Sequence, residues 1–190
     1  MKPDDKEANR WVIKAKQGNR KAFDRLVNLY QTPILALTYH VLGDYDEAKD
    51  AAQEAFIRAF ENISRFKQDS RFSTWLYRIA VNVALDETRR KKRRKTDPLS
   101  ATKLLKSDAH TETPAQEYEQ RQENKEQHKR IFKAMQHLSK QQRTATVLKY
   151  FHDKSYKDIA DILNCSQATA RTHVFRALQH MKDYFEGSST

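Results

Sequence analysis

Residues that could bind unpaired nucleic acid are concentrated in the stretch from Ser70 to Lys95. It contains Trp75 and Tyr77, the amide of Asn82, and an unbroken basic run, Arg89 to Lys95. Aromatic rings can stack on bases, amides can hydrogen-bond to them, and cations can hold phosphates, a mixture that suits single strands better than an intact duplex. An ordinary amphipathic helix with a solvated charged end explains this segment equally well when it is taken alone.

A helix is the element that must position these side chains. With about 100° between successive residues, one side of this helix should face a core. That side carries Trp75, Leu76, Ile79, Ala80 and Val83. Another side carries Arg78, Val81, Asn82, Leu85 and Arg89. Ser73 is the expected N-cap, after the loop residues Arg71 and Phe72.

Composition indicates an all-α fold. Among 190 residues there are only 3 glycines and 4 prolines, which leaves little turn chemistry for a sheet, whereas helix-forming residues are frequent. The formal net charge of +11 favours polyanionic partners such as nucleic acid. A membrane surface, or plain solubility, remains an alternative explanation of this charge.

Several classes of protein are disfavoured by the sequence. The single cysteine, Cys165, excludes an internal disulfide and a metal–thiolate cluster, and no His pair has the helical spacing for zinc. No phosphate-binding GxxxxGK[ST] or nucleophile GxSxG motif is found, so we expect no catalytic site, no metal and no cofactor. The first residues lack a signal-like apolar run, and Ile34 to Leu42 is too short to span a bilayer, which predicts a cytoplasmic protein without membrane insertion.

Short helices are predicted to follow one another in the first part of the chain. Their expected ranges are Ala8–Lys16, Arg20–Tyr30, Pro33–Leu42 and Asp44–Asn62. Thr32 before Pro33 is typical of an N-cap followed by a first-turn proline, and Asp44 with Glu47 has the spacing of a capping box.

The helix at Asp44–Asn62 has two contrasting sides. Its buried stripe is rich in small residues, which permit close helix packing, and consists of Ala48, Ala52, Ala55, Phe56, Ala59 and Ile63. The opposite side carries Asp46, Asp50, Gln53, Glu54, Ile57 and Glu61. In a basic protein, an acidic face with an exposed isoleucine could bind a protein partner, although a solvated face is the simpler interpretation.

The composition changes after the basic run. Prolines, serines and threonines indicate a flexible linker over residues 96–114, which separates a domain at 1–95 from a second domain at 115–190. We therefore predict two small helical domains, of which the C-terminal one contains a helix-turn-helix.

Two capping boxes mark helix starts in the second domain. Ser139 pairs with Gln142, and Ser155 with Asp158, at the required spacing of three residues. The helix after Ser139 has an apolar side that includes Val147, Leu148, Tyr150 and Phe151.

The last two helices have the pattern of a helix-turn-helix. The first, which carries Ile159, Ala160 and Leu163, can pack onto apolar residues of the second, namely Ala170, Val174, Ala177, Leu178 and Met181. The residues left outward are Gln167, Ala168, Arg171, Thr172 and Arg176. Side chains on the first turns of such a helix can read base edges in the major groove of duplex DNA. A plain helical hairpin is the alternative.

The order of these segments resembles one known family. GDYDEAKDAAQEAFIRAF, then FSTWLYRIAVNVALDETRR, then a linker, then LSKQQRTATVLKYFHDKSYKDIADILNCSQATARTHVFRAL are similar to the extracytoplasmic-function group of sigma-70 RNA polymerase sigma factors. The resemblance spans about residues 20–183. It implies a factor that binds core RNA polymerase, directs it to promoter DNA and promotes melting, and that is not itself an enzyme.

Site residues follow from this resemblance. The acidic helix would dock on the coiled coil of the largest polymerase subunit through Asp46, Asp50, Gln53, Glu54 and Ile57. The minus 10 element would be captured by Phe66, Arg71, Phe72, Trp75, Arg78, Asn82 and Arg89, with the Phe66–Phe72 loop holding a flipped base. The minus 35 element would be read by Ser166, Gln167, Ala168, Arg171, Thr172 and Arg176. Lys49 departs from the family pattern, which has an acidic residue there.

Further partners are implied by the resemblance alone. Members of this group are commonly held inactive by an anti-sigma factor, often membrane-bound, and many control stress-response genes. Three other classes remain open on the residues: a conventional helix-turn-helix regulator, a helical adaptor protein and an enzyme acting on nucleic acid. The Trp75–Asn82 cluster beside an acidic docking face favours the sigma factor over all three.

Overall fold

The computed structural model describes residues 5–67, 69–96, 127 and 130–187, and all regular elements in these ranges are helices. The N-terminal half consists of α1 (Asp5–Lys16), α2 (Arg20–Leu42), α3 (Tyr45–Asn62), the 3₁₀ turn η1 (Ile63–Arg65) and α4 (Phe72–Thr96). The C-terminal half consists of a helical segment at 130–136 followed by α6 (Lys140–Tyr150), α7 (Tyr156–Leu163) and α8 (Gln167–Gly187). The all-α prediction is confirmed. Apart from Thr96, which ends α4, the predicted linker lies outside the described residues.

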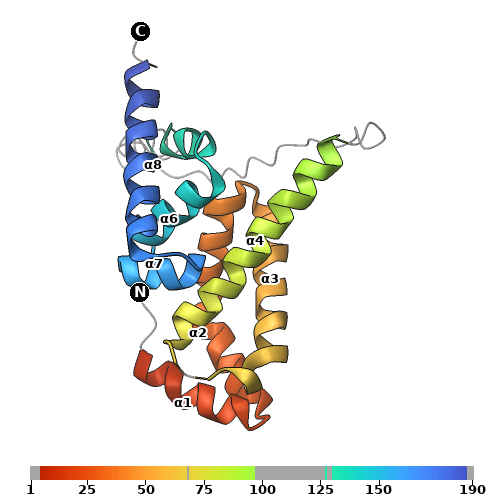
Figure 1. Cartoon of the computed structure of the whole chain (residues 1–190). Coiled ribbons are helices and arrows are strands. Elements are labelled where there is room, and N and C mark those ends of the chain that lie inside the picture. Colours follow the sequence, from red (N-terminus) through yellow and green to blue (C-terminus); the bar gives the residue numbers. More distant parts are fainter. Residues whose placement is uncertain (1–4, 68, 97–126, 128–129, 188–190) are drawn as a thin grey trace, which may run out of the picture.

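The N-terminal half is a bundle built around α2. This helix packs on α1, α3 and α4, and α4 also packs along α3 (Figure 1). The alanine stripe of α3 is buried as predicted, and it allows α3 to lie close to α2. Gly43, in the left-handed conformation at φ +86°, ends α2, and the carboxylate of Asp44 accepts from the Glu47 N–H at the start of α3.

α2 is one continuous helix, whereas the sequence predicted a break before Pro33. A proline inside a helix costs about 3 kcal/mol because it removes a hydrogen bond and crowds the preceding turn. Tyr30, Ile34 and Leu37, on either side of it, are fully buried. Since each buried large apolar side chain contributes about 1.5 to 3 kcal/mol, packing outweighs the local cost and the helix continues.

The start of α4 also differs from the prediction. The helix begins at Phe72, and the Trp75 N–H donates to the carbonyl of Arg71, so Ser73 lies inside the first turn instead of capping it. Phe72 is buried against Tyr30, with ring centroids 5.6 Å apart. Anchoring this ring in the core draws Phe72 into the helix and moves the start two residues earlier than predicted.

The C-terminal half has the predicted capping boxes and helix-turn-helix. Ser139 with Gln142 opens α6, and Ser155 with Asp158 opens α7, each with both reciprocal hydrogen bonds. Leu178, which was expected to pack under the preceding helix, is 42% exposed, and Tyr150, on the apolar side of its helix, is 54% exposed. Phe151 is 47% exposed, since α6 ends before it and its ring lies at the junction with α2.

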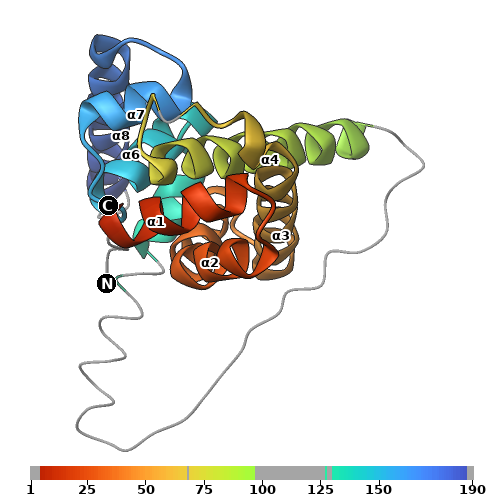
Figure 2. The same cartoon turned by 90° about the horizontal axis from the view of Figure 1, so that it is seen from below.

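The two halves contact each other directly. α6 packs on the end of α2, and α7 packs on the beginning of α4 (Figures 1 and 2). Within the described residues, no helix combines the length and apolar character needed to cross a membrane.

Candidate nucleic-acid interface

A surface cavity of about 340 Å³ lies between the end of α3 and the middle of α4. It is lined by Arg58, Asn62, Arg65, Trp75, Ile79 and Asn82. The predicted residues Trp75 and Asn82 are thus brought together, and Asn82 is exposed. An indole face, two amides and two guanidinium groups around one hollow are the chemistry that a displaced base with its phosphate requires.

Three of the cavity residues were missed by sequence reasoning. Arg58, Asn62 and Arg65 recur at helical spacing and continue from α3 into η1, on the side that faces α4. This helical spacing is the feature of the sequence from which the three residues could have been predicted. Arg58 is held by Glu54, with Nε and Oε1 2.7 Å apart, and both side chains are partly exposed. Exposed pairs of this kind are weak, so a phosphate can compete for the guanidinium.

Arg78 lies on α4 between Trp75 and Asn82, which line the cavity. Its side chain is partly buried, and its Nε is buried without a hydrogen-bond partner among the described residues. The cavity beside it does not include Arg78. The Arg78 guanidinium is therefore only partly accessible to solvent, and its side chain packs against the rest of the bundle.

The two phenylalanines of the predicted loop are part of the core. Phe66 is 4% exposed and Phe72 is 2% exposed. Their rings lie 5.0 Å and 5.6 Å from that of Trp75, so the three form one aromatic cluster. Lys16 donates from Nζ to the Phe66 carbonyl over 2.7 Å, which ties the loop to α1. In this structure the phenylalanines shape the loop and support Trp75 from below, and their faces are not open for stacking on a base.

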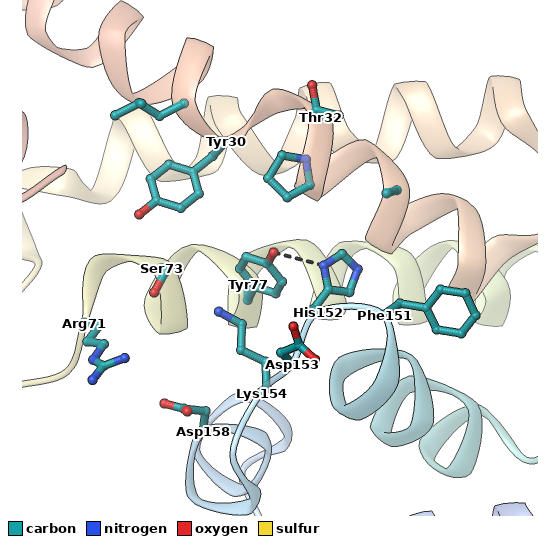
Figure 3. A pocket seen from close by; sticks show the side chains of 13 residues that line it. Tyr30, Thr32, Arg71, Ser73, Tyr77, Phe151, His152, Asp153, Lys154 and Asp158 are labelled. Carbon is teal, nitrogen blue, oxygen red and sulfur yellow. Dashed lines mark hydrogen bonds between the residues drawn. The ribbon is translucent and has the colours of Figure 1, made fainter. Parts of the chain in front are cut away.

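Arg71 is exposed at the other end of the loop and faces the C-terminal half. It lines a cavity of about 600 Å³ together with Tyr77, His152 and Asp158 (Figure 3). Burial opposes ionisation of Asp158, yet hydrogen bonds from Ser155 and the nearby Lys154 and Arg71 hold the pKa of this carboxyl below its ordinary value. The Arg71 side chain therefore lines a different cavity from Trp75 and Asn82 and lies within the electrostatic field of the Asp158 carboxylate.

The basic run at the end of α4 is partly matched by acidic side chains. Arg89 pairs with Asp86 at 3.1 Å, and Lys91 reaches Glu47 of α3 at 2.7 Å. The Arg89 side chain is largely exposed, so its pair is readily exchanged for a phosphate.

The acidic face of α3 is exposed as predicted. Asp46, Asp50 and Gln53 are exposed, Glu54 is partly so, and Ile57 is 53% exposed. Asp50 and Glu54 also line a groove of about 480 Å³ with Glu87 of α4. Lys49 is exposed on the same helix, so its charge is presented to solvent.

The start of α8 presents the predicted duplex-reading residues to solvent. Ser166 accepts from the Thr169 N–H at 3.0 Å and so caps the helix. The exposed residues are Ser166, Gln167, Ala168, Arg171, Thr172 and Arg176. The Arg171 guanidinium lies 5.3 Å from the ring centre of Tyr156. Phe175 is also exposed on this helix. The sequence did not predict this, because an apolar residue is not expected on a polar surface.

Two family models match the chain. Sigma-70 region 2 matches residues 26–94, and Sigma-70, region 4 matches residues 128–181. Both candidate DNA surfaces lie within these ranges: the cavity beside Trp75 in the first, and the exposed start of α8 in the second.

Curated relatives match most of the chain. The RNA polymerase sigma-H factor of Pseudomonas aeruginosa is 36% identical over 169 residues, which cover 87% of this chain and 87% of that protein. The ECF RNA polymerase sigma factor SigW of Bacillus subtilis is 34% identical over 179 residues, which cover 90% of this chain and 92% of that protein.

Solved structures share the fold. The sigma factor RpoE of Bartonella quintana, in complex with the anti-sigma factor NepR, matches with a TM-score of 0.68 at 22% identity, over 87% of this chain and 98% of that chain. CnrH, in complex with the cytosolic domain of CnrY, matches with a TM-score of 0.67 at 20% identity, over 95% of this chain and 98% of that chain. The two family models and the relatives above 30% identity place the chain in the extracytoplasmic-function group of the sigma-70 family of RNA polymerase sigma factors.

Proposed function

We propose that the protein binds core RNA polymerase through the acidic face of α3, reads minus 35 and minus 10 elements with α8 and α4, and promotes melting of promoter DNA. The observation that carries this proposal is the cavity in which Trp75 and Asn82 meet the cations of Arg58 and Arg65. It lies beside an exposed acidic helix, so that a docked polymerase and a captured strand would be neighbours.

Melting of promoter DNA breaks the stacking between bases, and the free energy lost must be offset by new contacts. Unstacking a base costs a few kcal/mol, and stacking it on a protein aromatic returns about 1 to 3 kcal/mol. Trp75 offers such a face, and the amides of Asn62 and Asn82 offer hydrogen bonds to base edges. Bases trapped as they emerge would stabilise an open bubble, and polymerase would carry out the chemistry.

Charge reversal on α3 tests polymerase docking. We expect co-elution with core RNA polymerase for the wild type and its loss for an Asp50→Lys, Gln53→Lys variant. Asp24→Lys reverses an exposed carboxylate on α2 and is the matched control, which should still co-elute. Failure of the folded wild type to bind polymerase would overturn the proposed function.

Asn82→Ala tests strand capture. Permanganate reactivity of promoter thymines in the polymerase complex should fall, whereas binding of the same promoter as closed duplex should persist. Asn28→Ala, at an exposed position of α2, serves as the control. Equal reactivity in both variants would remove Asn82 from the capture site.

An anti-sigma factor is proposed as a further partner, since the two structural neighbours are held in complexes with CnrY and NepR. We propose a cytoplasmic location and a stress-response regulon on the same family grounds. Affinity purification from the native host should recover a partner whose cytosolic part blocks co-elution with polymerase. Recovery of polymerase alone, under every growth condition tried, would argue against such a regulator.

A further inference from the structure

The ring of Tyr156, the first residue of α7, lies close to two cations from other helices. The guanidinium of Arg171 on α8 is 5.3 Å from the ring centre, and the ammonium of Lys149 on α6 is 4.8 Å from it. A cation within about 6 Å of the centre of an aromatic ring is attracted by the negative face of that ring. Since α6, α7 and α8 pack on one another (Figure 1), the cluster joins all three helices beside the exposed start of α8.

The position of the Tyr156 ring is fixed by the residues around it. The Ser155 hydroxyl accepts from the Asp158 N–H over 3.0 Å, and the Asp158 carboxylate accepts from the Ser155 N–H over 3.2 Å, so the backbone is capped directly before Tyr156. The Tyr156 side chain is partly buried and packs against the hydrophobic core. A tyrosine has only two side-chain torsion angles, so little freedom is left to the ring. It therefore offers a rigid surface to the flexible arginine side chain.

The other residues predicted to read the duplex are arranged differently from Arg171. The Thr172 hydroxyl donates to the Ala168 carbonyl of its own helix over 2.9 Å, and the Ser166 hydroxyl caps the first turn of α8. Both hydroxyls are thus engaged within the helix. Arg176 is exposed and has no ring contact among the described residues. Of the two exposed arginines, Arg171 alone is held against a ring.

Holding an arginine before DNA binds favours base contacts over phosphate contacts. A free arginine side chain has many rotamers and loses most of this freedom when it binds. A bidentate contact with guanine also requires the planar guanidinium to meet the base edge in one orientation, whereas a phosphate can be approached from several directions. A side chain that is already ordered loses less freedom on binding. The ring should therefore strengthen binding to the correct sequence more than binding to DNA in general.

We propose that Tyr156 is a positioning residue for minus 35 recognition, and that the face of its ring holds the Arg171 guanidinium in the orientation that contacts a base edge. The Tyr156 hydroxyl is not required for this role. The inference rests on the proposed function, because it assumes that α8 reads duplex DNA. Lys149 lies near the same ring, but its ammonium lacks the planar fork of a guanidinium and would hold a phosphate.

Binding of the full-length protein to two duplexes tests this role. A matched duplex is selected with the wild type from a random-sequence pool, and a scrambled duplex of the same composition is the reference. The readout is the ratio of the two affinities. Tyr156→Leu should lower this ratio about two- to fivefold, since an exposed cation–π contact contributes about 0.5 to 1 kcal/mol. Tyr156→Phe keeps the ring and should retain the wild-type ratio, as should Tyr150→Leu, the matched control at an exposed tyrosine of α6.

Further variants separate positioning from a merely structural role, which would weaken binding to both duplexes alike. In an Arg171→Ala background, Tyr156→Leu should not change the ratio further. Lys149→Ala should lower both affinities and reduce the salt dependence by about one counterion, as expected of a phosphate contact. Should Tyr156→Leu fail to fold, fluorinated phenylalanines at position 156 keep the shape of the ring and weaken the negative charge of its face. The ratio should then fall as fluorine atoms are added.

Two outcomes of the binding assay would overturn the positioning role. One is an unchanged ratio in Tyr156→Leu. The other is a loss in Tyr156→Phe as large as in Tyr156→Leu, which would assign the contact to the hydroxyl.

A second readout contains no DNA. In NMR spectra of the free protein, the ring current of Tyr156 should shift the side-chain protons of Arg171 upfield in the wild type and in Tyr156→Phe, but not in Tyr156→Leu. Absence of this shift in the wild type would also overturn the positioning role. A wild type that shows the shift but binds all duplexes alike would refute minus 35 recognition itself, and with it the role given to Tyr156.

Discussion

Acidification should open the contact between the two halves through His152. Burial, assisted by the nearby His40 and Lys154 and opposed by Asp153, lowers the pKa of this imidazole from 6.5 to about 4. When the Tyr77 hydroxyl donates to Nδ1, the neutral ring carries its proton on Nε2, which is buried without a hydrogen-bond partner among the described residues. A second proton must therefore bind at Nδ1, where it displaces the hydrogen bond from Tyr77. Tyr77 faces this nitrogen from α4.

The direction of the pH effect follows from which form, with the two halves closed or separated, binds the proton of His152 more weakly. A closed form that lowers the pKa of a base is fully favoured above the ordinary pKa, and it loses that advantage as the pH falls toward the lowered value. The window therefore runs from 6.5 down to about 4. At about 1.4 kcal/mol for each pKa unit, the closed form loses about 3 kcal/mol over the whole window and about 1.4 kcal/mol by about pH 5.5.

The assay is the distance between spin labels on cysteines that replace the exposed Asn9 of α1 and Lys157 of α7 in a Cys165→Ser background, measured between neutral pH and about pH 5.5. We expect the separated population to rise about tenfold relative to the closed one over this interval. His152→Gln keeps an acceptor for the Tyr77 hydroxyl but does not titrate, so its distance should not respond to pH. His180→Gln removes an exposed histidine from α8 and should behave as the wild type. A wild type without any response, or a response that survives in His152→Gln, would refute the reasoning.

Two further outcomes are expected on the same physical grounds. Arg171→Ala should weaken binding to a minus 35 duplex by about 1 to 3 kcal/mol if the guanidinium contacts a base, and fluorescence anisotropy on matched and scrambled duplexes would show whether the loss depends on sequence. Asp44→Ala removes the side chain that caps α3 and should lower the free energy of unfolding by about 1 kcal/mol, measured by urea denaturation, with Asp24→Ala as the exposed control.

Features that depend on residues close together in the sequence were the most predictable. The capping boxes at Ser139 and Ser155 and the end of α2 at Gly43 depend on residues a few positions apart, and each is present as predicted. The continuous path of α2 through Pro33 was not predictable, because it depends on side chains that pack against other helices.

Contacts between distant segments were invisible in the sequence. Arg143 donates to a backbone carbonyl of Val41, and a carbonyl has no residue type that could reveal it. The burial of Phe66 and Phe72 depends on the position of Trp75 relative to α2, which a pattern of aromatic residues does not specify. The acidic face of α3 and the outward face of α8 were predictable because exposure follows helical periodicity.

The uninterrupted α2 has a mechanical consequence. Its 23 residues form a rod about 35 Å long, which packs on α1, α3 and α4 and contacts Arg143 at its last turn. A ligand on α3 that rotated this rod by about 10° around its first turn would displace Val41 by about 6 Å, further than any hydrogen bond can stretch. A small rotation at one surface of the molecule would therefore act as a lever on the carbonyl that holds the other half in place.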